Sequence, residues 1–180
     1  MKLIETELSG LYIIESNVFH DSRGYFFEGF NRESLLNEGL DIQVVQTNIS
    51  KSEAGVVRGL HFQNPPFAQG KLIRVLKGAV LDVVVDIRKE SATYGEHLAI
   101  ELSDKNHKAV WVPPGFAHGF KTLVDETLFH YDCTEVYNKA SEGSIVWNDP
   151  TLNIDWAIAN PILSPKDENG QLFKNFNSQF

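Results

Sequence analysis

Apolar and polar residues alternate with a period of two along most of this chain, a pattern typical of strands that bury one face. Two apolar, β-branched runs at residues 71–76 and 79–87 are joined by Lys77 and Gly78, which predicts a β-hairpin. Further strands are predicted at residues 97–102, 109–112, 120–124 and 127–134. Many short strands separated by turn sequences predict an all-β sandwich, barrel or jelly roll.

Helical patterns are few. Asn31 is a suitable N-cap for a short helix over residues 32–38, which Gly39 would end. The segment from Asn148 onward has several prolines and little periodicity, so it is expected to wrap around the β core. We therefore predict one domain over residues 1–180, with a jelly-roll core at about 45–147 and a C-terminal wrap at about 148–180.

Composition excludes some partners. The chain has 16 Lys and Arg against 24 Asp and Glu, a formal net charge of −8. Non-specific binding to nucleic acid is not expected, because there is no surplus of cations to displace phosphate counterions. The first residues lack the apolar run of a signal peptide, and no run approaches the length of a membrane span. With one cysteine, Cys133, no internal disulfide can form, and we expect a cytoplasmic protein.

Two histidines lie in the most distinctive segments. His61 belongs to the strand-forming run 56–63, and His118 ends the motif Pro-x-Gly-x-x-His over residues 113–118. The motif at residues 113–118 resembles the second sequence motif of the cupins, which are small jelly-roll barrels. The first cupin motif contains a His-x-His pair and a glutamate a few residues on. Here Gln63 replaces the second histidine and no suitable glutamate follows, whereas a divalent metal needs three or four ligands. Histidine also titrates near neutral pH, so a general base is the other interpretation of His61.

A longer series of motifs runs in order along nearly the whole chain. The segments are Phe19-x-Asp21-x-Arg23-Gly24-x-Phe26-x-Glu28, Gln46-x-Asn48-x-Ser50, Arg58-Gly59-Leu60-His61-Phe62-Gln63, Gly70-Lys71-Leu72, Gly115-Phe116-Ala117-His118-Gly119-Phe120, Tyr131-x-Cys133-Thr134, Trp147-Asn148-Asp149-Pro150 and Leu163-Ser164-x-Lys166-Asp167. The ordered set resembles the dTDP-4-dehydrorhamnose 3,5-epimerases, a family of cofactor-independent nucleotide-sugar epimerases. The resemblance implies a cupin-like jelly roll, or double-stranded β-helix, with N- and C-terminal extensions and a few short helices.

The resemblance also implies a reaction. Its substrate would be dTDP-4-dehydro-6-deoxy-D-glucose, whose C4 ketone acidifies the hydrogens on C3 and C5, and its product dTDP-4-dehydro-L-rhamnose, for dTDP-rhamnose synthesis. His61 would be the general base, with Asp167 orienting its ring. Tyr131 would donate a proton on the opposite face, and Lys71 would stabilise the enolate. Because the ketone supplies the acidity, no metal, nicotinamide or flavin cofactor is implied.

A set of substrate-binding residues follows from the same resemblance. For the diphosphate and the sugar these are Arg23, Arg58, Lys71, His118 and Lys166. For the nucleotide they are Phe26, Gln46, Thr47 through its backbone, Asn48 and Tyr137, and Glu28 and Glu142 are further binding positions. The family implies a homodimer, in which the alternating apolar segment Lys2–Ile14 would add to the partner's sheet.

Each of these roles has a structural alternative. Taken alone, His61 and Tyr131 are also consistent with core residues whose polar atoms are hydrogen-bonded, and Asp167 with the cap of a turn over residues 164–170. Two other functions stay open. One is a sibling epimerase that inverts only C3 or C5, because such an enzyme can keep both His61 and Tyr131. The other is a metal-binding cupin.

One detail conflicts with a regular strand at residues 56–63. Arg58 and His61 are assigned to one site, yet residues three apart in a regular strand point to opposite faces. We predict a bulge or twist at Gly59 that brings both side chains to the same side.

Overall fold

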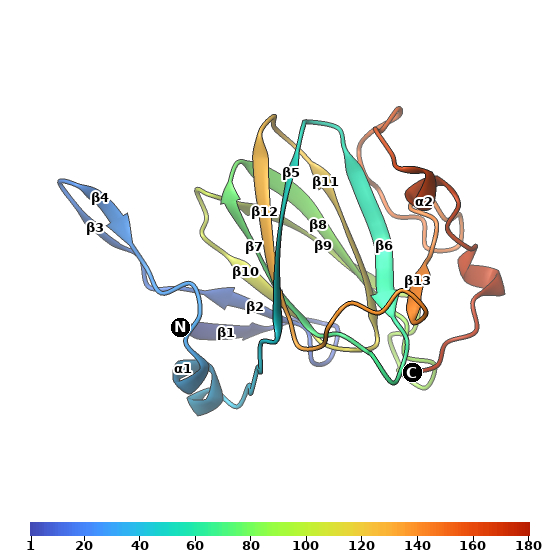
Figure 1. The fold of residues 1–180 in the computed structure, drawn as a ribbon, viewed down its shortest axis with the longest axis horizontal. Helices are drawn as coiled ribbons and strands as arrows, with labels where there is room; N and C mark the ends of the chain where they lie inside the picture. Colours follow the sequence, from blue (N-terminus) through green and yellow to red (C-terminus); the bar gives the residue numbers. More distant parts are fainter.

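The computed structural model describes residues 1–180 and consists mainly of two antiparallel β-sheets that face each other (Figure 1). The six-stranded sheet has the order β1-β2-β10-β7-β12-β5, and the five-stranded sheet has the order β13-β6-β11-β8-β9. The strands of the first sheet are β1 (Lys2–Glu5), β2 (Tyr12–Glu15), β5 (Gln46–Ser52), β7 (Lys71–Lys77), β10 (Ala109–Val112) and β12 (Thr127–Cys133). Those of the second are β6 (Val57–Gln63), β8 (Ala79–Asp86), β9 (His97–Ser103), β11 (Phe116–Thr122) and β13 (Glu142–Ser144). The all-β prediction is confirmed.

Inward-facing apolar residues of both sheets form the core between them. Ile73 and Phe129 from the six-stranded sheet pack with Val84 and Phe120 from the five-stranded sheet. The rings of Phe120 and Phe129 stack with their centroids 4.0 Å apart. This core supports the polar side chains that line a cavity beside it, described below.

The predicted hairpin between residues 71–76 and 79–87 is wrong. Both segments are strands, but β7 pairs with β10 and β12 in one sheet, while β8 pairs with β9 and β11 in the other. Only Gly78 separates β7 from β8, which is too short for a two-residue hairpin turn. Gly78 has φ +87°, and a Cβ there would lie 2.3 Å from Thr127 Oγ1, so glycine lets the chain cross between sheets at this point.

The N-terminal segment joins its own sheet. β1 pairs with β2, and β2 pairs with β10, so Lys2–Ile14 extends the six-stranded sheet of the same chain. The expected addition of this segment to a partner's sheet is not what the single chain shows. The edge of β10 within the chain already accepts it. A separate hairpin of β3 (Phe19–Asp21) and β4 (Gly24–Phe26) projects from the body (Figure 1).

The predicted helix after Asn31 is confirmed as α1 (Arg32–Asn37), and the Asn31 side chain accepts a hydrogen bond from the Ser34 N–H. It covers the outer face of the six-stranded sheet through Leu35. None of the helices is long and apolar enough to cross a membrane.

The C-terminal segment lies over the outer face of the five-stranded sheet (Figure 1). Trp156 and Phe173 pack there with Leu60 and Val83. Two short helices, α2 (Pro165–Glu168) and the 3₁₀ helix η1 (Phe173–Asn175), belong to this segment. It places α2 next to β6, which brings residues distant in sequence together.

Two details concern the strands that carry the histidines. β11 begins at Phe116 rather than at residue 120, so His118 lies within the strand and pairs directly with His61 on β6. The register between β6 and β11 then shifts, because Phe120 pairs with Arg58. Gly59 has φ +119°, and a Cβ there would lie 2.5 Å from Gly119 Cα. The predicted irregularity at Gly59 is confirmed, and both Arg58 and His61 line the same cavity.

Candidate active site

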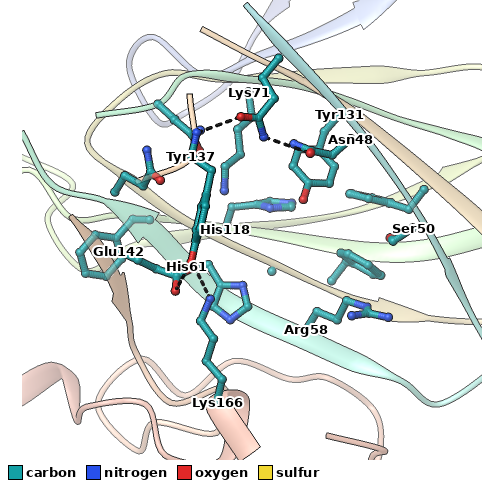
Figure 2. Close-up of a pocket in the computed structure, with 17 residues that line it drawn as sticks. Asn48, Ser50, Arg58, His61, Lys71, His118, Tyr131, Tyr137, Glu142 and Lys166 are labelled. Carbon is teal, nitrogen blue, oxygen red and sulfur yellow. Dashed lines mark hydrogen bonds and ion pairs between the residues drawn. The ribbon is translucent and has the colours of Figure 1, made fainter. Parts of the chain in front are cut away.

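A cavity of about 310 Å³ lies between the two sheets, a size typical of small-molecule sites. Figure 2 shows His61, His118 and Tyr131 around it, with Glu142 and Lys166 on one side and Ser50 and Arg58 on the other. The residues that line it are Gln46, Asn48, Ser50, Arg58, His61, Phe62, Gln63, Gln69, Lys71, His118, Gly119, Phe120, Phe129, Tyr131, Tyr137, Glu142 and Lys166.

Paired strands of the six-stranded sheet supply one wall. Tyr131 on β12 pairs with Asn48 on β5, and two residues along Phe129 pairs with Ser50. All four side chains therefore share the inward face, because alternate residues of a strand point to the same side. Lys71 enters the cavity from the start of the neighbouring strand β7.

His61 contacts a buried carboxylate from the other end of the chain. Its Nε2 lies 2.8 Å from Oδ1 of Asp167, whose side chain is 3% exposed against 26% for His61. The oxygen lies off the direction of the ring N–H, so this is a close charge-dipole contact rather than a linear hydrogen bond. With Nε2 facing Asp167, Nδ1 is the nitrogen of the neutral ring that is left to accept a proton.

The electrostatics keep His61 neutral near pH 7. Burial lowers the pKa of His61 below its ordinary value; the contact with Asp167 opposes this, and the nearby Lys166 ammonium adds to it. Burial alone would raise the pKa of Asp167, but the close contact with His61 and the hydrogen bonds from Gly59 and Ser164 outweigh it. Its pKa is therefore held well below the usual range, and the site pairs a neutral imidazole with an ionised carboxylate.

Tyr131 and Lys71 also line the cavity, and burial shifts the pKa of each. Burial raises the pKa of the Tyr131 phenol, so this group stays protonated and can donate a proton. Burial lowers the pKa of the Lys71 ammonium, the direction expected when a cation leaves bulk water. A base, a proton donor and a lysine thus line one cavity.

His118 forms a second histidine–carboxylate pair. Its Nε2 lies 2.8 Å from Oδ2 of Asp82, and both side chains are buried. The His118 ring also stacks on Phe129, with centroids 6.0 Å apart. No group of three or more His, Cys, Asp or Glu side chains is arranged to hold a metal ion, and each of the two histidines contacts its own carboxylate.

The two ends of the cavity carry further polar contacts. At one end, Lys166 forms an ion pair with Glu142, whose other oxygen accepts a hydrogen bond from the Tyr137 hydroxyl at 3.3 Å. At the other end, Arg58 donates through Nε and an Nη to the Ser52 hydroxyl, both at 3.2 Å. Both ends therefore offer cations to an anionic ligand.

Four of the residues assigned to the substrate do not reach this cavity in the single chain. Arg23 and Phe26 lie on the β3–β4 hairpin, and Glu28 follows it. Thr47 points to the outer face of β5, where its hydroxyl donates to Asp132 at 2.6 Å. Asp167 does not line the cavity either, but stands directly behind His61. The other assigned residues all line it.

Sequence reasoning assigned no role to several lining residues. Ser50 is the most informative, because its buried Oγ has no hydrogen-bond partner. The sequence signal for Ser50 is that polar residues, including Gln46 and Asn48, occupy the even-numbered positions of β5. Phe120 and Phe129 also line the cavity, and their place at its wall depends on the fold.

Comparison with known proteins identifies the family of the chain. The family model described as dTDP-4-dehydrorhamnose 3,5-epimerase matches residues 5–175. The enzyme of that name from Shigella flexneri is 48% identical over 174 residues, covering 96% of both chains. The crystal structure of the enzyme from Elizabethkingia anophelis superposes with a TM-score of 0.93 at 49% identity and covers 99% of each chain.

A solved structure with a ligand is also similar. The 3,5-epimerase from Legionella pneumophila, in complex with dTDP-4-keto-L-rhamnose, has a TM-score of 0.93 and 42% identity, covering 98% of this chain and 94% of its own. Sequence similarity, fold and the placement of the motifs all point to the same group. The chain belongs to the dTDP-4-dehydrorhamnose 3,5-epimerase family.

Proposed function

We propose that this protein inverts C3 and C5 of dTDP-4-dehydro-6-deoxy-D-glucose and gives dTDP-4-dehydro-L-rhamnose for dTDP-rhamnose synthesis. Family membership supports the reaction type. The observation that carries the proposal is the meeting of His61, Lys71 and Tyr131 at one cavity, with the buried carboxylate of Asp167 behind His61. A cytoplasmic location stays a prediction from composition.

The base is His61. Its Nδ1 takes the proton from a carbon next to the ketone. The electron pair of that C–H bond forms a double bond to C4, and the carbonyl π pair moves to the C4 oxygen to give an enolate. Asp167 stabilises the imidazolium that results, because an ionised carboxylate lies 2.8 Å from Nε2. General base catalysis of this kind contributes about 10²–10⁴-fold to the rate.

The acid and the cation complete the inversion. Lys71 stabilises the enolate oxygen, since a fixed positive charge in an enclosed site lowers the energy of developing negative charge. The Tyr131 hydroxyl returns a proton to the opposite face of the sugar. His118, held by Asp82, contacts the sugar near the ketone. Before the second inversion the His61 imidazolium releases its proton to water and the Tyr131 phenolate takes one up, and the same steps then act at the second carbon.

The remaining residues bind the nucleotide diphosphate. Arg58 and Lys166 contact the phosphates from the two ends of the cavity, and Tyr137 stacks on the thymine. Gln46, Asn48 and Glu142 complete the nucleotide side. Thr47 takes part only through its backbone, because its side chain points away from the cavity.

The protein is proposed to act as a homodimer. Arg23, Phe26 and Glu28 then serve the partner's cavity instead of their own. The hairpin that carries Arg23 belongs to neither large sheet, and Phe19 and Phe26 on it are 63% and 66% exposed. A two-stranded hairpin with exposed aromatic rings is marginal in water and needs a surface to pack on.

Mixed dimers test this arrangement. His61→Ala and Arg23→Ala homodimers are both expected to be weakly active. Mixing them after denaturation and refolding should restore activity, because one heterodimeric cavity then contains an intact His61 and an intact Arg23. A monomer in sedimentation analysis, or no recovery on mixing, would contradict the proposal.

The reaction itself is tested by incubation with dTDP-4-keto-6-deoxyglucose in deuterated water, followed by NMR of the sugar. Deuterium at both C3 and C5 is expected. Label at one carbon alone would instead identify a single epimerase. Absence of label, together with a stoichiometric metal bound through His61 and His118, would favour a metal-binding cupin.

A further inference from the structure

The Asp167 carboxylate is fixed by groups other than the histidine it supports. Oδ1 accepts a hydrogen bond from the Gly59 N–H at 2.9 Å and also lies 2.8 Å from His61 Nε2. Oδ2 accepts one from the Ser164 hydroxyl at 2.5 Å and a longer one from the Ser164 N–H at 3.3 Å. Hydrogen bonds from Gly59 and Ser164 therefore fix the carboxylate independently of the imidazole.

The Ser164 contacts are reciprocal. Ser164 is the N-cap of α2, and its Oγ accepts from the Asp167 N–H at 3.3 Å while the Asp167 side chain accepts from Ser164. This is a capping box in which the returning side chain is the carboxylate that faces His61. The turn-capping and catalytic interpretations of Asp167 are thus both consistent with the structure.

We propose that Ser164 is a positioning residue for the epimerisation, which holds the Asp167 carboxylate in the orientation that serves His61. The proposal rests on the proposed roles of His61 and Asp167 in the reaction. Asp167 is nearly fully buried, so no bulk water replaces a lost donor on Oδ2. Without the hydroxyl, Oδ2 keeps only the longer backbone contact, so the carboxylate is held mainly through Oδ1 by Gly59 and is less firmly oriented toward the ring.

The groups around His61 define what a change in Asp167 does. Asp167 faces it from α2 together with Lys166, Lys71 approaches from β7, and His118 lies in register on β11. Asp167 is the one anion among them that raises the pKa of His61. Loss of its fixed orientation weakens the stabilisation of the imidazolium, so the acid limb of the pH profile moves to lower pH.

The central variant is Ser164→Ala. We expect kcat to fall about tenfold with KM little changed, as for groups that orient a functional side chain from outside the site. The acid limb of kcat/KM against pH should shift downward. Ser164→Thr keeps the hydroxyl, so it should keep the wild-type kcat and the wild-type position of the acid limb. Ser164→Gly removes the hydroxyl but is a tolerated N-cap, so it should match Ser164→Ala while remaining well folded.

The matched control is Ser91→Ala. Ser91 also donates a hydroxyl hydrogen bond to Oδ2 of a buried carboxylate, Asp86, at 2.6 Å, but neither residue lines the cavity. This control should lower Tm and leave kcat and the pH profile unchanged. A Ser164→Ala enzyme with a lower Tm but unchanged kcat and limb would overturn the proposal, as would a change confined to KM.

Asp167→Asn distinguishes failure of the role proposed for Ser164 from failure of the proposed histidine–carboxylate pair. If this variant loses activity while both hydroxyl-free Ser164 variants keep normal kinetics, only the role of Ser164 fails. If Asp167→Asn itself keeps wild-type kcat and pH profile, the proposed histidine–carboxylate pair fails, and Ser164 with it.

Discussion

Asp86 and Asp167 are two buried carboxylates that the same physics keeps ionised, but their donors come from different distances along the chain. Asp86, at the end of β8, accepts hydrogen bonds from Arg88, Ser91 and Thr93, all within seven residues. Asp167 accepts from Ser164 nearby but also from Gly59, 108 residues away. One carboxylate stabilises a local turn, whereas the other joins α2 to β6.

The charged partners differ as well. Asp86 faces the guanidinium of Arg88, which is always protonated, and its hydrogen bonds outweigh burial to lower its pKa to about 2. Asp167 faces the imidazole of His61, which gains and loses a proton near neutral pH. A buried carboxylate of this kind therefore stabilises the fold when its partner carries a permanent charge, and it can also serve chemistry when its partner gains and loses a proton.

The largest expected effect concerns activity. Asp167→Asn should lower kcat by about 10³-fold or more, because an amide in place of the carboxylate no longer stabilises the imidazolium of His61. The isosteric change Asp86→Asn should leave kcat within about twofold. Steady-state kinetics with dTDP-4-keto-6-deoxyglucose measures both. Equal losses in the two variants would erase the distinction between the sites.

The next effect concerns stability at the Asp86 site. Asp86 is fully buried, and the fall in its pKa from 3.8 to about 2 corresponds to roughly 2 kcal/mol of stability at neutral pH. Because the folded pKa is the lower one, this stability is present above pH 4 and is lost as the pH falls toward 2. Urea unfolding of Asp86→Asn at pH 7 should show the loss.

The same variant has a signature in acid. Between pH 4 and 2 the wild-type free energy of unfolding should fall more steeply than that of Asp86→Asn, because the variant has no carboxyl to protonate there. Parallel curves for the two proteins across this range would show that Asp86 does not carry the expected linkage.

A third effect tests the titrating partner. The pKa of His61 is lowered, so the neutral base is fully present above its ordinary value of 6.5 and is lost as the pH falls below the lowered value. kcat/KM should therefore be level near pH 7 and decline about tenfold per pH unit on the acid side. An acid limb lying above pH 6.5 would contradict this assignment.

The smallest effect comes from a single donor at the local site. Thr93→Val removes a hydroxyl that donates to Asp86 at 2.7 Å, at an expected cost of about 1 kcal/mol in stability. Thermal unfolding measures the loss, and the epimerisation rate should not change. A drop in kcat would mean that the turn after β8 is coupled to the cavity.

The comparison also shows what the sequence could predict. The turn around Asp86 depends on residues close in the chain. The contact of Asp167 with His61 depends on how the C-terminal segment lies over β6, so spacing alone left Asp167 as a turn cap; only family resemblance paired it with His61. Local patterns did predict the α1 cap at Asn31 and the irregularity at Gly59.

Strand positions were more predictable than strand partners. The runs that became β7 and β8 have the right period, but their pairing is decided by the whole sheet, and the turn signal at Gly78 marks a crossing between sheets. The places of Arg23 and Phe26 were missed for a related reason. These residues lie on a hairpin outside the cavity of their own chain, and a local motif does not tell where the fold places it.

The central claim is that His61 removes the proton next to the ketone. Its most direct test is the rate of deuterium uptake at C3 and C5 of dTDP-4-keto-6-deoxyglucose by the His61→Ala variant, followed by NMR in deuterated water. Uptake at both carbons should slow by about 10²–10⁴-fold relative to the wild type, while the Tm stays close to it. Uptake at both carbons near the wild-type rate would show that another group is the base.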